Sequence, residues 1–136
     1  MGKTILASNL LPFRAVRSQN NDFELLMRIG GISSGLRNFY SRENSVWIGW
    51  TGNEKGHYNS EDKEKVNKLL ESQNCFPVEL KKKEIKHYLE GFSNRTLWPL
   101  FHYFNEKSTY RQEDWEYYVK VNKKYFKKIS EILEEG

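Results

Sequence analysis

The stretch Val46-Trp47-Ile48-Gly49-Trp50 decides the fold class of this chain. It is a short apolar run that closes at the polar turn Thr51-Gly52-Asn53. Such a run, bounded by turn residues, is typical of a strand that is buried on both faces, as in a parallel sheet. Three more segments with strand-like patterns lie on either side of it along the chain: residues 4–8, 23–29 and 75–80.

Segments with helical spacing separate these predicted strands. Residues 32–40 carry apolar side chains at helical intervals, and a second helix is predicted to begin at Ser60 as its N-cap residue. A third helix is predicted from Ile85, and residues 115–133 have the strongest helical periodicity. Strands that alternate with helices predict an α/β sandwich with a mainly parallel sheet. We expect four apolar strand residues to be buried in that sheet: Ile5, Ala7, Val46 and Ile48.

The composition limits the class of protein. A length of 136 residues suits one domain, residues 1–136, and 38% hydrophobic, 29% charged and 15% aromatic residues indicate a globular chain. The apolar runs are too short to span a bilayer, and the mean hydropathy is −0.81. We therefore expect a cytoplasmic protein with no membrane partner. The single cysteine, Cys75, excludes an internal disulfide and a zinc site built on cysteines.

The charge balance favours a small anionic ligand at least as much as a nucleic acid. The net charge is +4, but the lysines are interleaved with acids, as in Glu61-Asp62-Lys63-Glu64-Lys65. This pattern is typical of solvated helix faces with charge pairs three or four residues apart. Because no recognition motif accompanies the charge, we expect no nucleic-acid partner. A phosphorylated small substrate suits a mildly basic domain equally well.

Two residue patterns are candidates for a binding site. The run Gly30-Gly31-Ile32-Ser33-Ser34-Gly35 follows a predicted strand and opens a helix, so its backbone N–H groups could hold a phosphate; the alternative is a plain tight turn. The glycine spacing is not that of a dinucleotide site. The tryptophans Trp47, Trp50 and Trp98 could stack on a sugar ring or simply pack in the core. His57, His87 and His102 lack the spacing of metal ligands, so we expect neither a metal nor a cofactor.

Four sequence blocks, in this order, point to one known family. Ser8-Asn9-Leu10-Leu11-Pro12 is similar to the motif Ser-Asn-Arg-Leu-Pro, and Gly30 to Leu36 is similar to Gly-Gly-Leu-Val-Ser-Ala-Leu. Trp47 to Gly52 matches Trp-x-Gly-Trp-x-Gly, and Gly91 to Tyr103 is nearly identical to the family's longest block. Trp115, Tyr118, Val119 and Asn122 fit a helix of the same family. The chain thus resembles the N-terminal part of trehalose-6-phosphate synthases, glycosyltransferase family 20.

The resemblance implies a fold, a reaction and a site. The family transfers glucose from UDP-glucose to glucose-6-phosphate with retention, in a GT-B fold of two Rossmann-like domains that face each other across a cleft. The N-terminal domain holds mainly the acceptor, and the C-terminal domain holds mainly the donor. Here this implies a Rossmann-like three-layer domain, with Gly30 and Gly31 near the phosphate and Trp50 and Trp98 beside the acceptor sugar. It implies no catalytic residue within this chain.

Three departures from the family pattern bear on function. The arginine that helps to hold the acceptor phosphate is Leu10 here, and the acceptor-binding tyrosine aligns with Leu89. Tyr88 is one place away, and an α-helical rotation of about 100° per residue would turn it elsewhere. The chain also ends at Gly136, before the family's next strand, so the donor domain would be absent.

These departures leave two main hypotheses. The chain is the acceptor-side part of a trehalose-6-phosphate synthase, inactive alone, or it is a non-catalytic binding or regulatory module derived from that family. Its expected partners are a sugar phosphate or nucleotide sugar, and either a second copy or a separate donor domain. A cut-short domain would expose a sheet edge and apolar surface, which we expect a dimer or the helix at 115–133 to cover.

Overall fold

The computed structural model describes residues 2–40, 44–102 and 105–135 of the chain. Tyr103, the last residue of the longest family-like block, lies outside the described residues. The elements in chain order are β1 (Thr4–Leu10), β2 (Phe13–Arg17), β3 (Phe23–Met27), α1 (Gly31–Tyr40), β4 (Ser45–Trp50), α2 (Ser60–Ser72), β5 (Cys75–Pro77), α3 (Lys82–Glu84), the π-helix η1 (Ile85–Leu97), α4 (Trp98–Phe101), the 3₁₀-helix η2 (Asn105–Lys107) and α5 (Gln112–Glu135).

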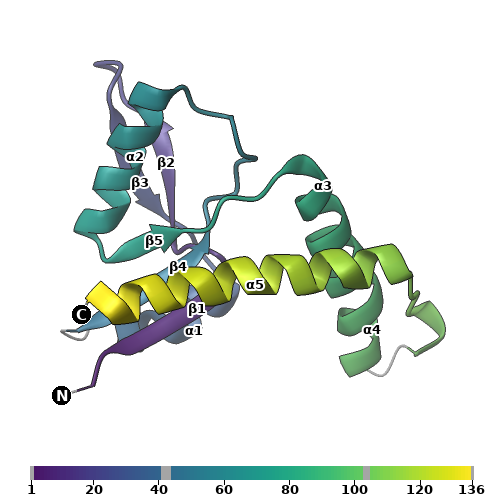
Figure 1. Ribbon diagram of the computed structural model, residues 1–136. Coiled ribbons are helices and arrows are strands. Elements are labelled where there is room, and N and C mark those ends of the chain that lie inside the picture. Colours follow the sequence, from purple (N-terminus) through teal and green to yellow (C-terminus); the bar gives the residue numbers. More distant parts are fainter. Residues whose placement is uncertain (1, 41–43, 103–104, 136) are drawn as a thin grey trace.

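A parallel sheet lies at the centre of the molecule, with β4 between β1 and β5 (Figure 1). Ile5 pairs with Val46 across the first ladder, and Trp47 pairs with Cys75 across the second. All six residues of β4 are buried, as the continuous apolar run predicts. The prediction of an α/β fold with a mainly parallel sheet is therefore confirmed.

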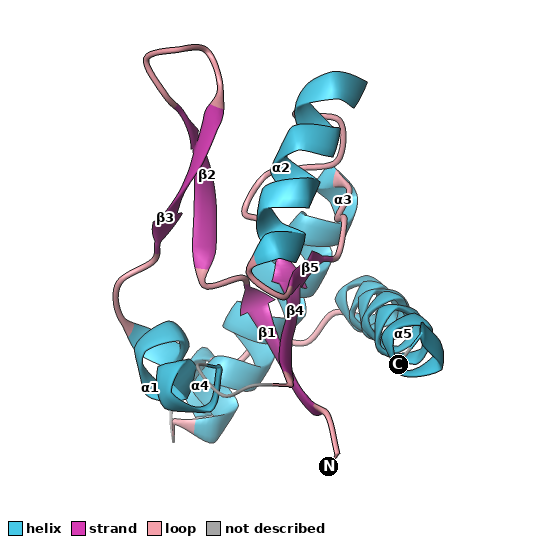
Figure 2. Ribbon diagram, turned by 90° about the vertical axis from the view of Figure 1, so that its left-hand side faces the viewer, coloured by secondary structure: helices cyan, strands magenta, loops and turns pink. Residues whose placement is uncertain are grey.

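Alternate side chains of β4 enter two separate hydrophobic clusters. Val46, Ile48 and Trp50 pack with α5, which contributes Val121 and Tyr125 to the same cluster. Trp47 points the other way and packs with apolar residues of the β2–β3 hairpin and α2. Figure 2 shows α5 on one side of the sheet and the hairpin with α1 on the other. The sheet is thus covered by different elements on its two faces.

Helix α5 packs on one face of the sheet, and the expectation that this helix or a dimer covers the sheet edge and the remaining apolar surface stays a prediction. The helix extends beyond the predicted range of 115–133, and it buries Val121, Tyr125 and Ile132. Phe126, one residue from Tyr125, is 70% exposed, because the rotation of about 100° per residue turns it away from the buried face of the helix. Within the described ranges, no helix has the length and apolar composition that crossing a membrane requires.

Two burial predictions for β1 are wrong. Val46 and Ile48 are buried, but Ile5 is only half-buried and Ala7 is exposed. The reason is the strand order: β1 lies at the edge of the three-stranded sheet, whereas β4 lies at its centre. A short apolar strand sequence does not reveal which of these positions it takes.

Several predicted element limits also change. The N-cap of α2 is Asn59, not Ser60, because the Asn59 Oδ1 atom accepts a hydrogen bond of 2.8 Å from the Asp62 N–H. Strand β5 ends at Pro77 instead of residue 80, and β3 ends at Met27 instead of residue 29. The segment predicted as a helix from Ile85 begins three residues earlier as α3 and continues as the π-helix η1.

The β2–β3 hairpin is an antiparallel pair that the sequence analysis missed. Phe13 to Arg17 forms its first strand, and the polar segment that follows is the hairpin turn. Asn21 in this turn has φ of 60°, a conformation that asparagine tolerates better than most residues. The two strands form a small sheet of their own beside the parallel sheet.

Gly49 lies where β4 passes very close to the end of β1. A Cβ atom at this position would lie 3.0 Å from the Leu11 nitrogen and 3.0 Å from the Ser8 carbonyl oxygen, and neither backbone atom can move freely. We expect Gly49→Ala to lower the free energy of unfolding by about 1–3 kcal/mol, as overpacking does elsewhere. Denaturant unfolding checks this.

Gly35→Ala is the matched control for this prediction. Gly35 is in α1, and nothing lies within 4 Å of the Cβ atom that alanine would add. Alanine is the better helix former, so Gly35→Ala should raise the free energy of unfolding by about 0.5–1 kcal/mol. Equal effects of the two substitutions would contradict the close approach at Gly49.

Candidate functional site

A cleft of about 670 Å³ lies beside the carboxyl end of β1, between the β2–β3 hairpin and the first turn of α1. Its position matches the general rule that α/β proteins bind ligands outside the carboxyl ends of their parallel strands. The residues that line it come from β1, β2, the end of β3 and the start of α1: Ser8, Asn9, Leu10, Arg14, Met27, Arg28, Ile29, Gly30, Gly31 and Ser33.

Arg28 extends from the end of β3 toward the loop that follows β4. Its Nη2 atom donates a hydrogen bond of 2.6 Å to the Thr51 carbonyl oxygen. Its Nε atom is buried and has no hydrogen-bond partner among the described residues. The guanidinium is thus anchored at one nitrogen, while a second polar nitrogen remains unsatisfied.

The cleft is positively charged. Burial lowers the pKa of the Arg28 guanidinium, and the charge of nearby Arg14 lowers it further. Arginine nevertheless stays protonated near neutral pH, so both cations are present. None of the described residues that line the cleft is acidic, and neither arginine forms an ion pair within the described part of the chain. This arrangement favours a bound anion.

The glycine pair forms the turn that leads into α1. Gly30 has φ of 97° and Gly31 has φ of 55°, backbone conformations that residues other than glycine rarely adopt. The Gly30 N–H donates to the Ser34 Oγ atom at 3.3 Å. No atom lies within 4 Å of a Cβ built on either glycine, so the turn faces open space at the cleft. A phosphate group could approach this backbone closely.

Leu10 lines the same cleft and is 37% exposed. The neighbouring Ser8 hydroxyl donates to the Leu10 carbonyl oxygen at 2.6 Å and accepts a hydrogen bond of 2.8 Å from the Trp47 indole N–H. These bonds hold the end of β1 in place. Among the residues expected to form the site, Leu10, Gly30 and Gly31 are therefore brought together.

Tyr88 and Leu89 lie on η1, and here the α-helical rotation used in the sequence analysis does not apply. A π-helix closes its hydrogen bonds from residue i to i+5, so neighbouring residues are turned by a different angle. Tyr88 is buried, and its hydroxyl donates a short hydrogen bond to the Asn9 side chain. Burial raises the pKa of Tyr88 to about 12. Leu89 is half-buried and packs against the hydrophobic cluster under α5.

The two tryptophans expected beside the acceptor sugar lie in different surroundings. Trp50 is buried at the end of β4, and its indole N–H donates to the Asn53 carbonyl oxygen at 2.7 Å. Trp98 opens α4, is 53% exposed, and stacks on His102 with 3.8 Å between ring centres. Neither is among the described residues that line the cleft beside β1.

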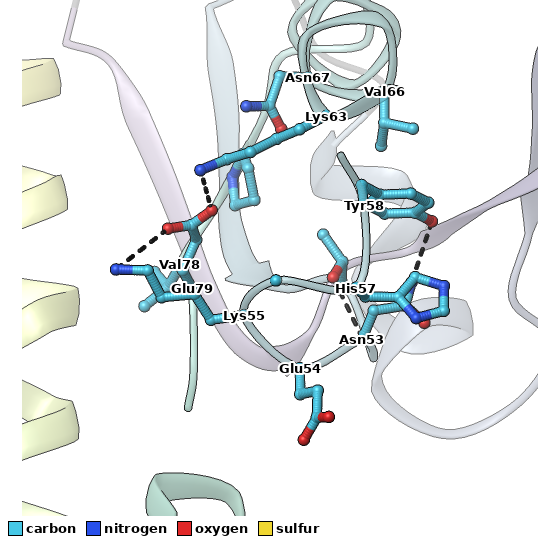
Figure 3. A pocket seen from close by; sticks show the side chains of 13 residues that line it. Asn53, Glu54, Lys55, His57, Tyr58, Lys63, Val66, Asn67, Val78 and Glu79 are labelled. Carbon is cyan, nitrogen blue, oxygen red and sulfur yellow. Dashed lines mark hydrogen bonds and ion pairs between the residues drawn. The ribbon is translucent and has the colours of Figure 1, made fainter. Parts of the chain in front are cut away.

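A second pocket, of about 40 Å³, lies between the loop after β4, α2 and the end of β5 (Figure 3). Lys63 forms a close ion pair with Glu79, and the Lys55 Nζ atom lies 4.0 Å from the same carboxylate. The Asn53 side chain donates to the Tyr58 hydroxyl at 3.1 Å. In this pocket, the charges of Lys55 and Lys63 are thus paired with Glu79, and the pocket volume suits a few water molecules. The larger cleft beside β1 is the better candidate.

The remaining histidines have local roles. His57 packs edge-on against Tyr58 at the small pocket, and the His87 Nδ1 atom lies 2.7 Å from an Asp114 carboxylate oxygen. Because His87 is on η1 and Asp114 is on α5, this contact links the two helices. Neither His87 nor Asp114 is among the described residues that line the cleft.

Sequence reasoning missed both arginines of the cleft. Arg14 lies on a strand that was not predicted, and Arg28 was assigned only to the interior of a strand over residues 23–29. A hairpin strand over Phe13 to Arg17 would have placed Arg14, but its signal is weak because Ala15 and Val16 are both apolar and interrupt the alternation, and no local pattern points to Arg28.

The class of protein follows from this geometry: an α/β domain of the Rossmann-like kind, with a ligand cleft at the end of its first parallel strand and a glycine turn at the helix start. Residues 2–136 match the family model described as glycosyltransferase family 20. The chain belongs to glycosyltransferase family 20.

Individual relatives agree with this assignment. The chain is 34% identical over 133 residues to alpha,alpha-trehalose-phosphate synthase [UDP-forming] A of Dictyostelium discoideum. This alignment covers 97% of the chain and 18% of that protein. The chain is 32% identical over 143 residues to the bifunctional trehalose-6-phosphate synthase/phosphatase of Thermoproteus tenax, covering 98% of the chain and 18% of the relative.

A solved structure shows the same fold. The UDP-forming trehalose-phosphate synthase of Burkholderia xenovorans superposes with a TM-score of 0.63 at 26% identity, over 97% of this chain and 25% of that one. The chain therefore spans between about a fifth and a quarter of the length of these relatives.

Proposed function

We propose that this chain is the acceptor-side, N-terminal part of a trehalose-6-phosphate synthase, and that the cleft beside β1 binds the phosphate of glucose-6-phosphate. One observation carries the proposal: the Ser8-Asn9-Leu10 segment and the Gly30-Gly31 turn, which resemble two separate blocks of the family, line one basic cleft. The structure of a Burkholderia xenovorans relative was solved in complex with glucose-6-phosphate, which supports a sugar phosphate as the ligand of this class.

The residues of the cleft suit a phosphate ester. Arg14 and Arg28 provide cations, and the start of α1 adds the positive end of a helix dipole. Phosphate carries a charge that a neutral sugar lacks, so the phosphate provides most of the expected affinity. The proposal keeps Trp98, exposed on α4, and Trp50 as expected contacts of the sugar ring.

A non-catalytic binding or regulatory module is the second candidate function. The observation that favours it is the pair of apolar residues, Leu10 and Leu89, at positions where the family resemblance implies an arginine and a tyrosine. Such a module would bind its ligand or a second copy of the chain without turnover. Turnover in the presence of a donor domain, discussed below, separates the two functions.

Replacing Leu10 with arginine should tighten the binding of glucose-6-phosphate. A new charge-assisted hydrogen bond to the phosphate is typically worth about 1.5–3 kcal/mol, so the unmodified chain should bind only weakly. Calorimetry with glucose-6-phosphate and with glucose measures the gain, which should be confined to the phosphorylated sugar.

Leu10→Met is the matched control, because it changes the shape of the side chain without adding charge. It should leave the affinity unchanged. Tight binding by the unmodified chain, or equal affinities of the Leu10→Arg variant and the unmodified chain, would contradict the proposed role of position 10.

A further inference from the structure

The hairpin register places two arginines on one face of β2–β3. Arg14 pairs with Leu26, and Arg28 follows two residues later, its N–H donating to the Pro12 carbonyl oxygen at 2.7 Å. Because side chains alternate along a strand, Leu26 and Arg28 share a face, and Arg14 is the diagonal neighbour of Arg28. The hairpin therefore brings two like charges to the same wall of the cleft.

The positive charges of the two guanidinium groups repel each other, and an anion bound between or beside them would offset this repulsion. Neither arginine has an acidic partner among the described residues, and the Arg28 Nε atom is buried without a hydrogen-bond partner. Two cations brought together without an acidic partner are costly, and a phosphate bound beside the guanidinium groups would offset that cost.

The Arg28 guanidinium also lies next to the side chain of residue 10. A Cβ atom built on Gly52 would lie 2.7 Å from the Arg28 Nη2 atom and 3.7 Å from the Leu10 Cδ2 atom. Both side-chain ends are thus within 4 Å of the same point. The cation that position 10 lacks is present beside it, on a different strand.

We infer that Arg28, assisted by Arg14, is the phosphate-binding residue of this cleft and replaces the arginine that is absent at position 10. The identity of the sugar rests on the proposed function, whereas the phosphate site rests on the cleft itself. The ligand class is a phosphate monoester or free phosphate, held by a guanidinium fork from the hairpin and by the N-terminal end of α1.

An NMR titration of the full chain with inorganic phosphate, glucose-6-phosphate and glucose tests this inference. We expect both phosphate compounds to shift the amide signals of Gly30 and Gly31, and Arg28→Gln to weaken both at least about tenfold. Glucose binding should not change. Arg37→Gln is the matched control, because Arg37 is an exposed arginine of α1 outside the cleft lining, and it should have no effect.

A second variant, Arg14→Gln, keeps the test decisive if Arg28→Gln unfolds the chain, and a double variant adds a rescue test if Arg28→Gln folds. Arg14 is exposed, so Arg14→Gln should fold normally and weaken phosphate binding by a smaller factor. The double variant Leu10→Arg/Arg28→Gln returns one guanidinium to the site and should restore binding. Leu10→Arg should therefore tighten binding more in the Arg28→Gln background than in the unmodified chain.

The outcomes separate this inference from the proposed function. Phosphate binding that Arg28→Gln and Arg14→Gln leave unchanged overturns the inference, as does a parent chain that binds neither phosphate compound. Arg28-dependent binding of inorganic phosphate without any preference for glucose-6-phosphate upholds the inference and counts against the proposed function. Restored phosphate binding in the double variant would support the inference that an arginine at position 10 and an arginine at position 28 can replace each other.

Discussion

Replacing Lys124 with methionine is expected to lower the free energy of unfolding by about 3–5 kcal/mol. Glu84, at the end of α3, is 1% exposed, and the Lys124 Nζ atom on α5 lies 2.7 Å from each of its carboxylate oxygens. The same Nζ atom donates to the Glu79 carbonyl oxygen at 3.1 Å. Without Lys124, a carboxylate remains buried with no opposite charge beside it, which is the costly way to break such a pair.

Denaturant unfolding measures this loss, and Lys127→Met is the matched control. Lys127 is an exposed lysine on the same helix, so its replacement should change the free energy of unfolding by less than about 0.5 kcal/mol. The double variant Glu84→Gln/Lys124→Met removes both charges and should recover part of the loss. A Lys124→Met variant as stable as its control would show that this ion pair does not hold α5 to α3.

The parallel sheet could be predicted because its strands are strong local signals. The run from Val46 to Trp50 is apolar throughout and is bounded by turn residues, and it is the fully buried central strand. The order of the strands could not be predicted, since β1 has a similar apolar sequence but lies at the edge, where Ala7 is exposed. Strand order depends on long-range packing, which a single strand sequence does not encode.

The hairpin and the π-helix were missed for a different reason. Phe13 to Arg17 is short, begins directly after Pro12 and lacks a strict period-2 alternation, because Ala15 and Val16 are both apolar. The π-helix from Ile85 to Leu97 differs from an α-helix in the spacing of its hydrogen bonds, and its residue composition does not distinguish the two. The position of Tyr88, with its hydroxyl on Asn9, depends on this helix type.

The candidate site was only half accessible from the sequence. Gly30, Gly31 and Leu10 were found through a motif and a resemblance, and all three line the cleft. Arg28 could not be found, because its role depends on the register of an unpredicted hairpin and on the loop at Gly52. Local sequence patterns identify residues with unusual backbone conformations. A cation that reaches a site from another strand can be identified only from the tertiary structure.

The 136-residue chain alone is expected to form no trehalose-6-phosphate from UDP-glucose and glucose-6-phosphate. The family resemblance implies that the donor nucleotide and the charge on its diphosphate leaving group are held by a C-terminal domain. Preorganised electrostatic stabilisation of that charge is usually the largest catalytic contribution, and acceptor binding alone cannot substitute for it. The chain spans 18–27% of the length of the curated relatives that it matches.

A product assay with the purified chain tests this expectation, and adding the C-terminal domain of a relative in a second arm makes it specific. Turnover by the chain alone would overturn the acceptor-side assignment. Turnover only with the added domain would support the proposed function, and Arg28→Gln should then raise the KM for glucose-6-phosphate more than it lowers kcat. This split follows because Arg28 binds the non-reacting phosphate, an interaction that is equally present in the ground state and the transition state. No turnover in either arm, combined with phosphate-dependent binding, would favour the binding or regulatory module instead.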